Sequence, residues 1–126
     1  MSVLIVEDVS VNRSYLRKIL EKNGHDVLEA EHGADALEIL KKTAVRCVVT
    51  DLDMPILDGW GLIAKMRSKP ESADIPVVLV TSSAEVEDVK RARRQGIKHY
   101  ILKPIDPDRI SAAIAAEIGG ASSDPR

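Results

Sequence analysis

The feature that most constrains the fold of this chain is the regular alternation of short apolar runs with segments of helical periodicity. Five runs have the pattern of buried strands, at residues 3–6, 26–30, 47–50, 77–80 and 100–102. Apolar residues at helical spacing follow each run, at residues 11–22, 34–42, 62–66, 85–94 and 107–118. Such alternation with short links predicts an α/β fold with a parallel sheet covered on both faces. Right-handed crossovers then favour a doubly wound open sheet.

Length and composition limit the classes of protein to which the chain can belong. Its 126 residues, 44% of them hydrophobic, suit one domain with one core. The net charge of -2, from 18 basic and 20 acidic residues, argues against a general binder of nucleic acids or membrane surfaces. No apolar stretch is long enough to span a bilayer, and nothing at the start resembles a signal peptide.

The single cysteine and the composition of the last residues bear on the location of the protein and on its domain boundary. Cys47 lies in an apolar run and cannot form a disulfide framework alone, so we expect a buried thiol and a cytoplasmic location. Residues 120–126 are rich in Ser with an Asp and a Pro, a composition typical of a flexible tail, which leaves residues 1–119 as the domain.

Reactive side chains follow four of the five predicted strands. In doubly wound sheets the working site lies beyond the carboxyl ends of the strands, at the topological switch point. The residues found there are Glu7 and Asp8 after the first strand, Asp51 after the third, Thr81 and Ser82 after the fourth, and Lys103 after the fifth. We therefore expect three carboxylates, hydroxyl groups and an ammonium group at one edge of the sheet.

This set of side chains suits phosphoryl transfer. Crowded carboxylates repel one another unless a cation neutralises them, and ligands that are all oxygen favour Mg²⁺, with Mn²⁺ as an alternative. Asp51 can attack phosphorus to form an aspartyl phosphate, while Lys103 and Thr81 stabilise the phosphoryl oxygens. Each residue alone also suits an ordinary helix cap or solvated loop, so the prediction depends on their combination.

Four ordered motifs make the chain resemble the receiver domains of bacterial response regulators, from about residue 2 to residue 118. The motifs are LIVED at residues 4–8, TDLDMP at 50–55 with Asp58-Gly59 after it, VTS at 80–82 and YILKP at 100–104. The resemblance implies a receiver domain with a flavodoxin-like sheet, in the strand order 2-1-3-4-5, flanked by five helices. It also implies a cis peptide bond between Lys103 and Pro104.

The resemblance assigns a role to each matching residue. Asp51 would be the phospho-acceptor, and Thr81 and Lys103 would bind the phosphoryl oxygens. The implied ligands of Mg²⁺ are Glu7, Asp8, Asp51 and the backbone carbonyl of Asp53. Glu7 departs from the more frequent Asp, and Asp53 places an acid two residues after the acceptor, which leaves the phosphate lifetime open.

The resemblance further implies a switch and its partners. Thr81 would move toward the phosphoryl group, and Tyr100 would rotate inward. The fourth helix, fifth strand and fifth helix would then present the signal. A histidine kinase or histidine phosphotransfer protein would donate the phosphoryl group and a downstream protein would read it, with no direct contact to nucleic acid. The oligomeric state stays open, including a dimer linked to phosphorylation.

Other classes of protein share some of these sequence features. The chain could be a receiver within a larger hybrid kinase or response regulator, or a binding-only receiver that is never phosphorylated. Asp51-Leu52-Asp53 also resembles the nucleophile motif of phosphohydrolases that form an aspartyl phosphate, but no insert could form a substrate pocket. A flavin or nucleotide carrier would need a phosphate loop after the first strand, where this chain has Glu7-Asp8. We expect a signalling switch that catalyses only its own phosphorylation and dephosphorylation at Asp51.

We expect structural roles for the single tryptophan and for the three histidines. Trp60 follows Gly59 near the predicted acceptor loop, so we expect it to pack in the core and its fluorescence to respond to Mg²⁺ or a phosphoryl mimic. His25, His32 and His99 lack the spacing of metal ligands and are expected at the surface or at strand edges.

Overall fold

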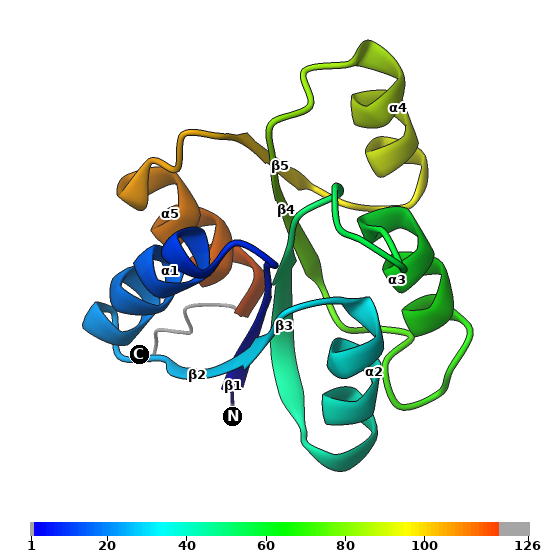
Figure 1. Ribbon diagram of the computed structural model, residues 1–126, viewed down its shortest axis with the longest axis horizontal. Helices are drawn as coiled ribbons and strands as arrows, with labels where there is room; N and C mark the ends of the chain where they lie inside the picture. Colours follow the sequence, from blue (N-terminus) through cyan, green and yellow to red (C-terminus); the bar gives the residue numbers. More distant parts are fainter. Residues whose placement is uncertain (1, 119–126) are drawn as a thin grey trace.

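The computed structural model describes residues 2–118, which form a five-stranded parallel sheet between two layers of helices (Figure 1). The strands are β1 (Ser2–Val6), β2 (Asp26–Ala30), β3 (Val45–Thr50), β4 (Val77–Thr81) and β5 (His99–Leu102). The helices are α1 (Ser10–Lys22), α2 (Gly33–Lys42), α3 (Gly59–Arg67), α4 (Val86–Arg94) and α5 (Pro107–Ile118). Strands and helices alternate along the whole described chain, as the sequence predicted.

The strand order is β2-β1-β3-β4-β5, which confirms the predicted doubly wound, flavodoxin-like sheet. The register aligns the carboxyl ends of the central strands. Val6 at the end of β1 pairs with Thr50 at the end of β3, and Thr81 at the end of β4 pairs with Leu102 at the end of β5. Residues that directly follow these strands therefore emerge at one edge of the sheet.

Two apolar layers fill the space between the sheet and the helices. Alternate residues of β1 divide between them: Leu4 and Val6 face α2, α3 and α4, while Val3 and Ile5 face α1 and α5. Because both faces of the sheet are covered, its strands read as continuous apolar runs instead of alternating ones. Cys47 is fully buried in the second layer, as predicted.

The predicted positions of the histidines and of Trp60 are confirmed, whereas the predictions for the chain end lie outside the described residues. The three histidines are each partly exposed, as expected. Trp60 is 8% exposed and belongs to the first apolar layer, which confirms its packing role. No helix within residues 2–118 combines the length and apolarity needed to cross a membrane. The predicted domain boundary at residue 119 and the predicted flexible tail lie outside the described residues.

Candidate functional site

Three charged side chains meet at the carboxyl edge of the sheet. Lys103, directly after β5, places its ammonium nitrogen 2.7 Å from Oδ2 of Asp51 and 2.9 Å from Oε1 of Glu7. Both carboxylates are buried, Glu7 being 1% and Asp51 6% exposed. The parallel strands of one sheet bring these residues together from sequence positions as far apart as 7 and 103. One lysine thus serves two buried carboxylates.

The electrostatics of the lysine and its glutamate partner follow from this burial. Burial raises the pKa of the Glu7 carboxyl, although hydrogen bonds from Lys103 and from the Val9 amide work against the rise. Burial also disfavours the charged form of Lys103, but its hydrogen bonds to Asp51 and Glu7 outweigh that effect and raise its pKa. The lysine is therefore held as a cation at neutral pH.

The loop after β3 fixes the orientation of Asp51. Its Oδ1 accepts a 3.2 Å hydrogen bond from the backbone amide of Asp53, while Oδ2 accepts from Lys103. The loop closes where the Gly59 amide donates to the carbonyl of Leu52 over 2.9 Å. Asp58 then caps α3, because its Oδ1 accepts from the Gly61 amide over 2.8 Å. Both carboxylate oxygens of Asp51 are thus held before any ligand arrives.

The two acidic residues after β1 differ in their burial. Glu7 turns inward, and its Oε2 accepts from the Val9 amide over 3.1 Å, whereas Asp8 is exposed at the rim. Arg13 of α1 holds the same loop by donating to the Glu7 carbonyl over 2.8 Å and to Glu29 over 2.9 Å. Sequence reasoning did not identify Arg13, because a helix arginine carries no signal that it reaches a neighbouring loop.

The predicted switch residues converge on Ser83 in the loop after β4. The Ser83 amide donates to Oγ1 of Thr81 over 3.2 Å, and the hydroxyl of Tyr100 donates to the Ser83 carbonyl over 2.8 Å. Thr81 is fully buried and Tyr100 is partly exposed; burial raises the pKa of the Tyr100 phenol. Ser82, the other predicted hydroxyl, is exposed. Ser83 is the junction that sequence reasoning missed.

Comparison with known proteins decides the family. Residues 3–115 match the model of the response regulator receiver domain family. The chain belongs to this family. It is a CheY-like receiver of two-component signalling, a family that works as signalling switches.

Relatives of this receiver cover nearly its whole length. A chemotaxis protein CheY homolog of Campylobacter jejuni is 34% identical over 126 residues, covering 98% of this chain and 97% of its own. The crystal structure of a response regulator receiver protein from Pseudomonas putida superposes with a TM-score of 0.85 at 28% identity, covering 91% and 95% of the two chains. The receiver domain of a sensor histidine kinase from Pseudomonas aeruginosa, described with a magnesium ion in its active site cleft, has a TM-score of 0.85 at 23% identity and covers 94% and 97%.

The donor set of this receiver fits a hard cation in its chemistry and charge. Glu7 and Asp51 carry two buried carboxylates against the single charge of Lys103, and Asp8 adds a third carboxylate at the rim. All the predicted ligands are oxygen atoms, as Mg²⁺ prefers. Among residues 2–118, no three His, Cys, Asp or Glu side chains are arranged as a ready metal cage. The fit therefore rests on charge and donor type.

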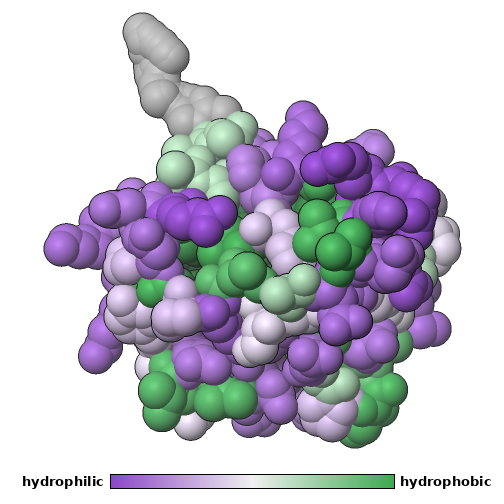
Figure 2. Space-filling view, turned by 90° about the horizontal axis from the view of Figure 1, so that it is seen from above, coloured by the Kyte–Doolittle hydropathy of each residue, from purple (hydrophilic) through white to green (hydrophobic). Residues whose placement is uncertain are grey.

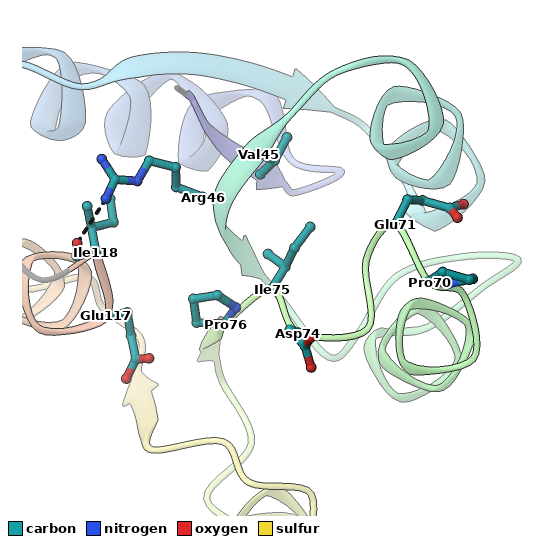
Figure 3. Close-up of a pocket in the computed structure, with 9 residues that line it drawn as sticks. All are labelled: Val45, Arg46, Pro70, Glu71, Asp74, Ile75, Pro76, Glu117 and Ile118. Carbon is teal, nitrogen blue, oxygen red and sulfur yellow. Dashed lines mark hydrogen bonds between the residues drawn. The ribbon is translucent and has the colours of Figure 1, made fainter.

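The surface seen from above (Figure 2) is mainly hydrophilic, and a cavity lies at the edge of the sheet opposite the candidate site. Figure 2, which looks down on the molecule of Figure 1, shows mainly hydrophilic side chains interrupted by separate apolar patches. A cavity of about 360 Å³ lies at the opposite, amino end of β3 and β4 (Figure 3). Its lining is Val45, Arg46, Pro70, Glu71, Asp74, Ile75, Pro76, Glu117 and Ile118. None of the predicted site residues lines this cavity.

Proposed function

We propose that this receiver accepts a phosphoryl group on Asp51 from a phosphohistidine, with Mg²⁺ required. The observation that carries the proposal is the 2.7 Å contact between Lys103 and Asp51, made at the edge where Glu7 and Thr81 also emerge. In this reaction a carboxylate oxygen of Asp51 forms a bond to phosphorus while the bond from phosphorus to the donor imidazole nitrogen breaks. The imidazole leaves with its electron pair and takes up a proton.

The chain's own residues hold and orient the reacting group. Lys103 supplies a positive charge beside the carboxylate, and the buried position of Asp51 lowers the local dielectric in which that charge acts. Thr81 Oγ1 accepts from the Ser83 amide, so its own hydroxyl proton can be donated to a phosphoryl oxygen. Glu7, Asp8, Asp51 and the carbonyl of Asp53 would hold Mg²⁺, which when bound neutralises charge on the phosphoryl oxygens.

The surroundings of Asp51 support a protein as the donor. Apolar side chains stand exposed after β1 (Val9, 47%), in the loop after β3 (Ile56, 91%), at the start of α4 (Val86, 64%) and at the end of β5 (Leu102, 42%). Exposed apolar groups around a polar centre are typical of protein contact surfaces. A histidine kinase or histidine phosphotransfer protein, meeting the receiver in the cytoplasm, fits this surface.

The signal leaves through Thr81, Tyr100 and the α4–β5–α5 face. Phosphorylation adds about 1.5 to 2 negative charges beside Lys103, which draws hydroxyl donors inward. Thr81 is joined through Ser83 to the Tyr100 hydroxyl. A movement of Thr81 therefore shifts the side chain of Tyr100 on β5 and the loop that leads into α4. A downstream protein reads the change, which biases two pre-existing conformations.

Intact mass measurement tests the proposal. Wild-type protein incubated with acetyl phosphate and Mg²⁺ is expected to gain one phosphoryl group, and chelation of Mg²⁺ should prevent the gain. Asp51→Asn should gain none, whereas the matched control Asp53→Asn, an exposed carboxylate two residues away, should still gain one. A phosphoryl group that persists on Asp51→Asn contradicts the assignment. Steady turnover of a small phosphate ester would favour a phosphohydrolase instead.

A further inference from the structure

Helix α4 is attached to the rest of the molecule by an unusually small apolar surface. Of its nine residues only Ala92 is buried, and Val86 at its start is 64% exposed. Figure 1 shows α4 at the outer end of the molecule, beyond α3. A helix with so few buried apolar contacts depends on its polar contacts for a fixed position.

Asp88 supplies these polar contacts. Its Oδ2 accepts a 2.5 Å hydrogen bond from the hydroxyl of Ser83, and its Oδ1 accepts a 3.4 Å hydrogen bond from the indole nitrogen of Trp60. Arg91, one turn along α4, places its guanidinium 4.6 Å from the centre of the Trp60 ring. Asp88 therefore joins α4 both to the loop after β4 and to α3.

Ser83 connects Asp88 to the switch residues. Its amide donates to Thr81 Oγ1, its carbonyl accepts from the Tyr100 hydroxyl, and its own hydroxyl donates to Asp88. When the Thr81 hydroxyl moves toward a phosphoryl group on Asp51, the hydrogen bond from the Ser83 amide draws Ser83 with it and away from Asp88. The hydrogen bond between Ser83 and Asp88 is then present only before this movement.

We infer that Asp88 is a positioning residue that holds Ser83 and α4 in the unphosphorylated arrangement and so opposes the switch; this inference rests on the proposed function. A contact made in only one of two conformations shifts the equilibrium toward that conformation. The hydrogen bond from Ser83 ends on a carboxylate, and bonds to charged groups are among the stronger ones. Removing Asp88 should therefore favour the phosphorylated conformation.

An acid in the first turn of a helix also stabilises that helix through the backbone dipole, and this simpler role needs a control. Glu87 provides it, because it lies in the same first turn of α4 and is exposed. Glu87→Ala removes the same charge next to the same helix end. Any difference between Asp88→Ala and Glu87→Ala then reports the contacts to Ser83 and Trp60.

The experiment measures the affinity for beryllofluoride, a phosphoryl mimic, by calorimetry with Mg²⁺ present. Asp88→Ala is expected to bind it about tenfold more tightly than wild type, since a hydrogen bond to a charged group is lost only from the resting state. Glu87→Ala is expected to match wild type. A purely structural role for Asp88 would weaken binding, not strengthen it. Trp60→Phe, which keeps one aromatic ring but removes the indole donor together with the second ring, should give a smaller gain and carries the test should Asp88→Ala unfold.

The outcomes separate the two proposals. If wild type binds beryllofluoride and Asp88→Ala binds no more tightly than Glu87→Ala, the inference about Asp88 is overturned and the proposed function stands. If no form binds it, wild type included, the proposed function fails and the inference falls with it. Faster amide hydrogen exchange of residues 86–94 in unliganded Asp88→Ala, absent from Glu87→Ala, is the supporting result; equal exchange in both variants overturns the inference.

Discussion

Gly59 lies directly against the backbone of Asp51. A Cβ atom built on Gly59 would lie 2.4 Å from the Asp51 carbonyl oxygen and 2.7 Å from the Cα of Leu52. Both are backbone atoms of the acceptor loop, so neither can swing aside as a side chain does. The close approach lets α3 begin immediately beside the acceptor, and only glycine permits it.

Gly59→Ala is therefore expected to displace the acceptor loop. We expect a loss of about 1–3 kcal/mol in the free energy of unfolding, the range for overpacked sites, together with slower phosphorylation by acetyl phosphate. Urea denaturation and a mass-based time course measure the two effects. Gly61→Ala is the matched control in the same helix, because its added Cβ would meet the end of the Leu57 side chain. Equal stability of the two variants would contradict the close approach.

Lys103→Met should expose the repulsion between the two buried carboxylates. Without the ammonium group, Glu7 and Asp51 lose their shared partner, and we expect a loss of about 1–3 kcal/mol in the free energy of unfolding near pH 7. Added Mg²⁺ should raise the melting temperature of this variant more than that of wild type, because the ion replaces the missing charge. Lys98→Met, at an exposed lysine, should change neither quantity. A Mg²⁺ response equal to that of wild type would count against the site.

The sequence predicted the fold and the location of the site because both depend on patterns local to the chain. Apolar runs over residues 3–6 and 77–80 and helical spacing between them set the element order. The observed ends lie within two residues of the predicted ones, except that α3 begins three residues earlier, at Gly59. The parallel topology then places every strand end at one edge. That is why Asp51 and Lys103 could be placed together before any contact was known.

The contacts between elements were not predictable in the same way. Three residues bond to partners far along the chain that no periodicity marks: Arg13 to Glu29, Ser83 to Tyr100 and Asp88 to Trp60. Glu7 and Asp8 were treated as an equivalent pair, yet the structure buries one and exposes the other. Which of the two adjacent acids turns inward depends on the position of Lys103 relative to them. That position is set by the tertiary structure and cannot be predicted from the local sequence.

Cys47 should be unreactive toward thiol reagents in the folded protein. Burial raises the pKa of its thiol to about 12, so the reactive thiolate is scarce at neutral pH and the sulfur has no access to solvent. Mixing native protein with a chromogenic disulfide should give labelling only at the rate of unfolding. Labelling of the native protein as fast as that of a urea-unfolded sample would contradict the buried position.

The same thiol makes stability fall at alkaline pH. In the unfolded chain the thiol ionises near its ordinary pKa of 9.0, whereas in the folded protein it keeps its proton to about 12. The unfolded state then binds fewer protons, so above pH 9 the free energy of unfolding should drop by up to about 1.4 kcal/mol per pH unit from this group. Cys47→Ala should lose stability less steeply between pH 9 and 10. Parallel pH profiles for the two proteins would exclude this contribution.

Trp60 should report the position of α4. Its indole nitrogen points to Asp88 and its ring lies under Arg91, so its emission depends on where α4 sits relative to α3. It is the only tryptophan, so the signal can be assigned without ambiguity. With binding first established by calorimetry, emission should change when beryllofluoride and Mg²⁺ fill the site, and change less with Mg²⁺ alone. Arg91→Ala should alter the starting spectrum and reduce the response, since it removes the charge over the ring. An unchanged spectrum at saturation would mean that α4 keeps its place when the site is filled.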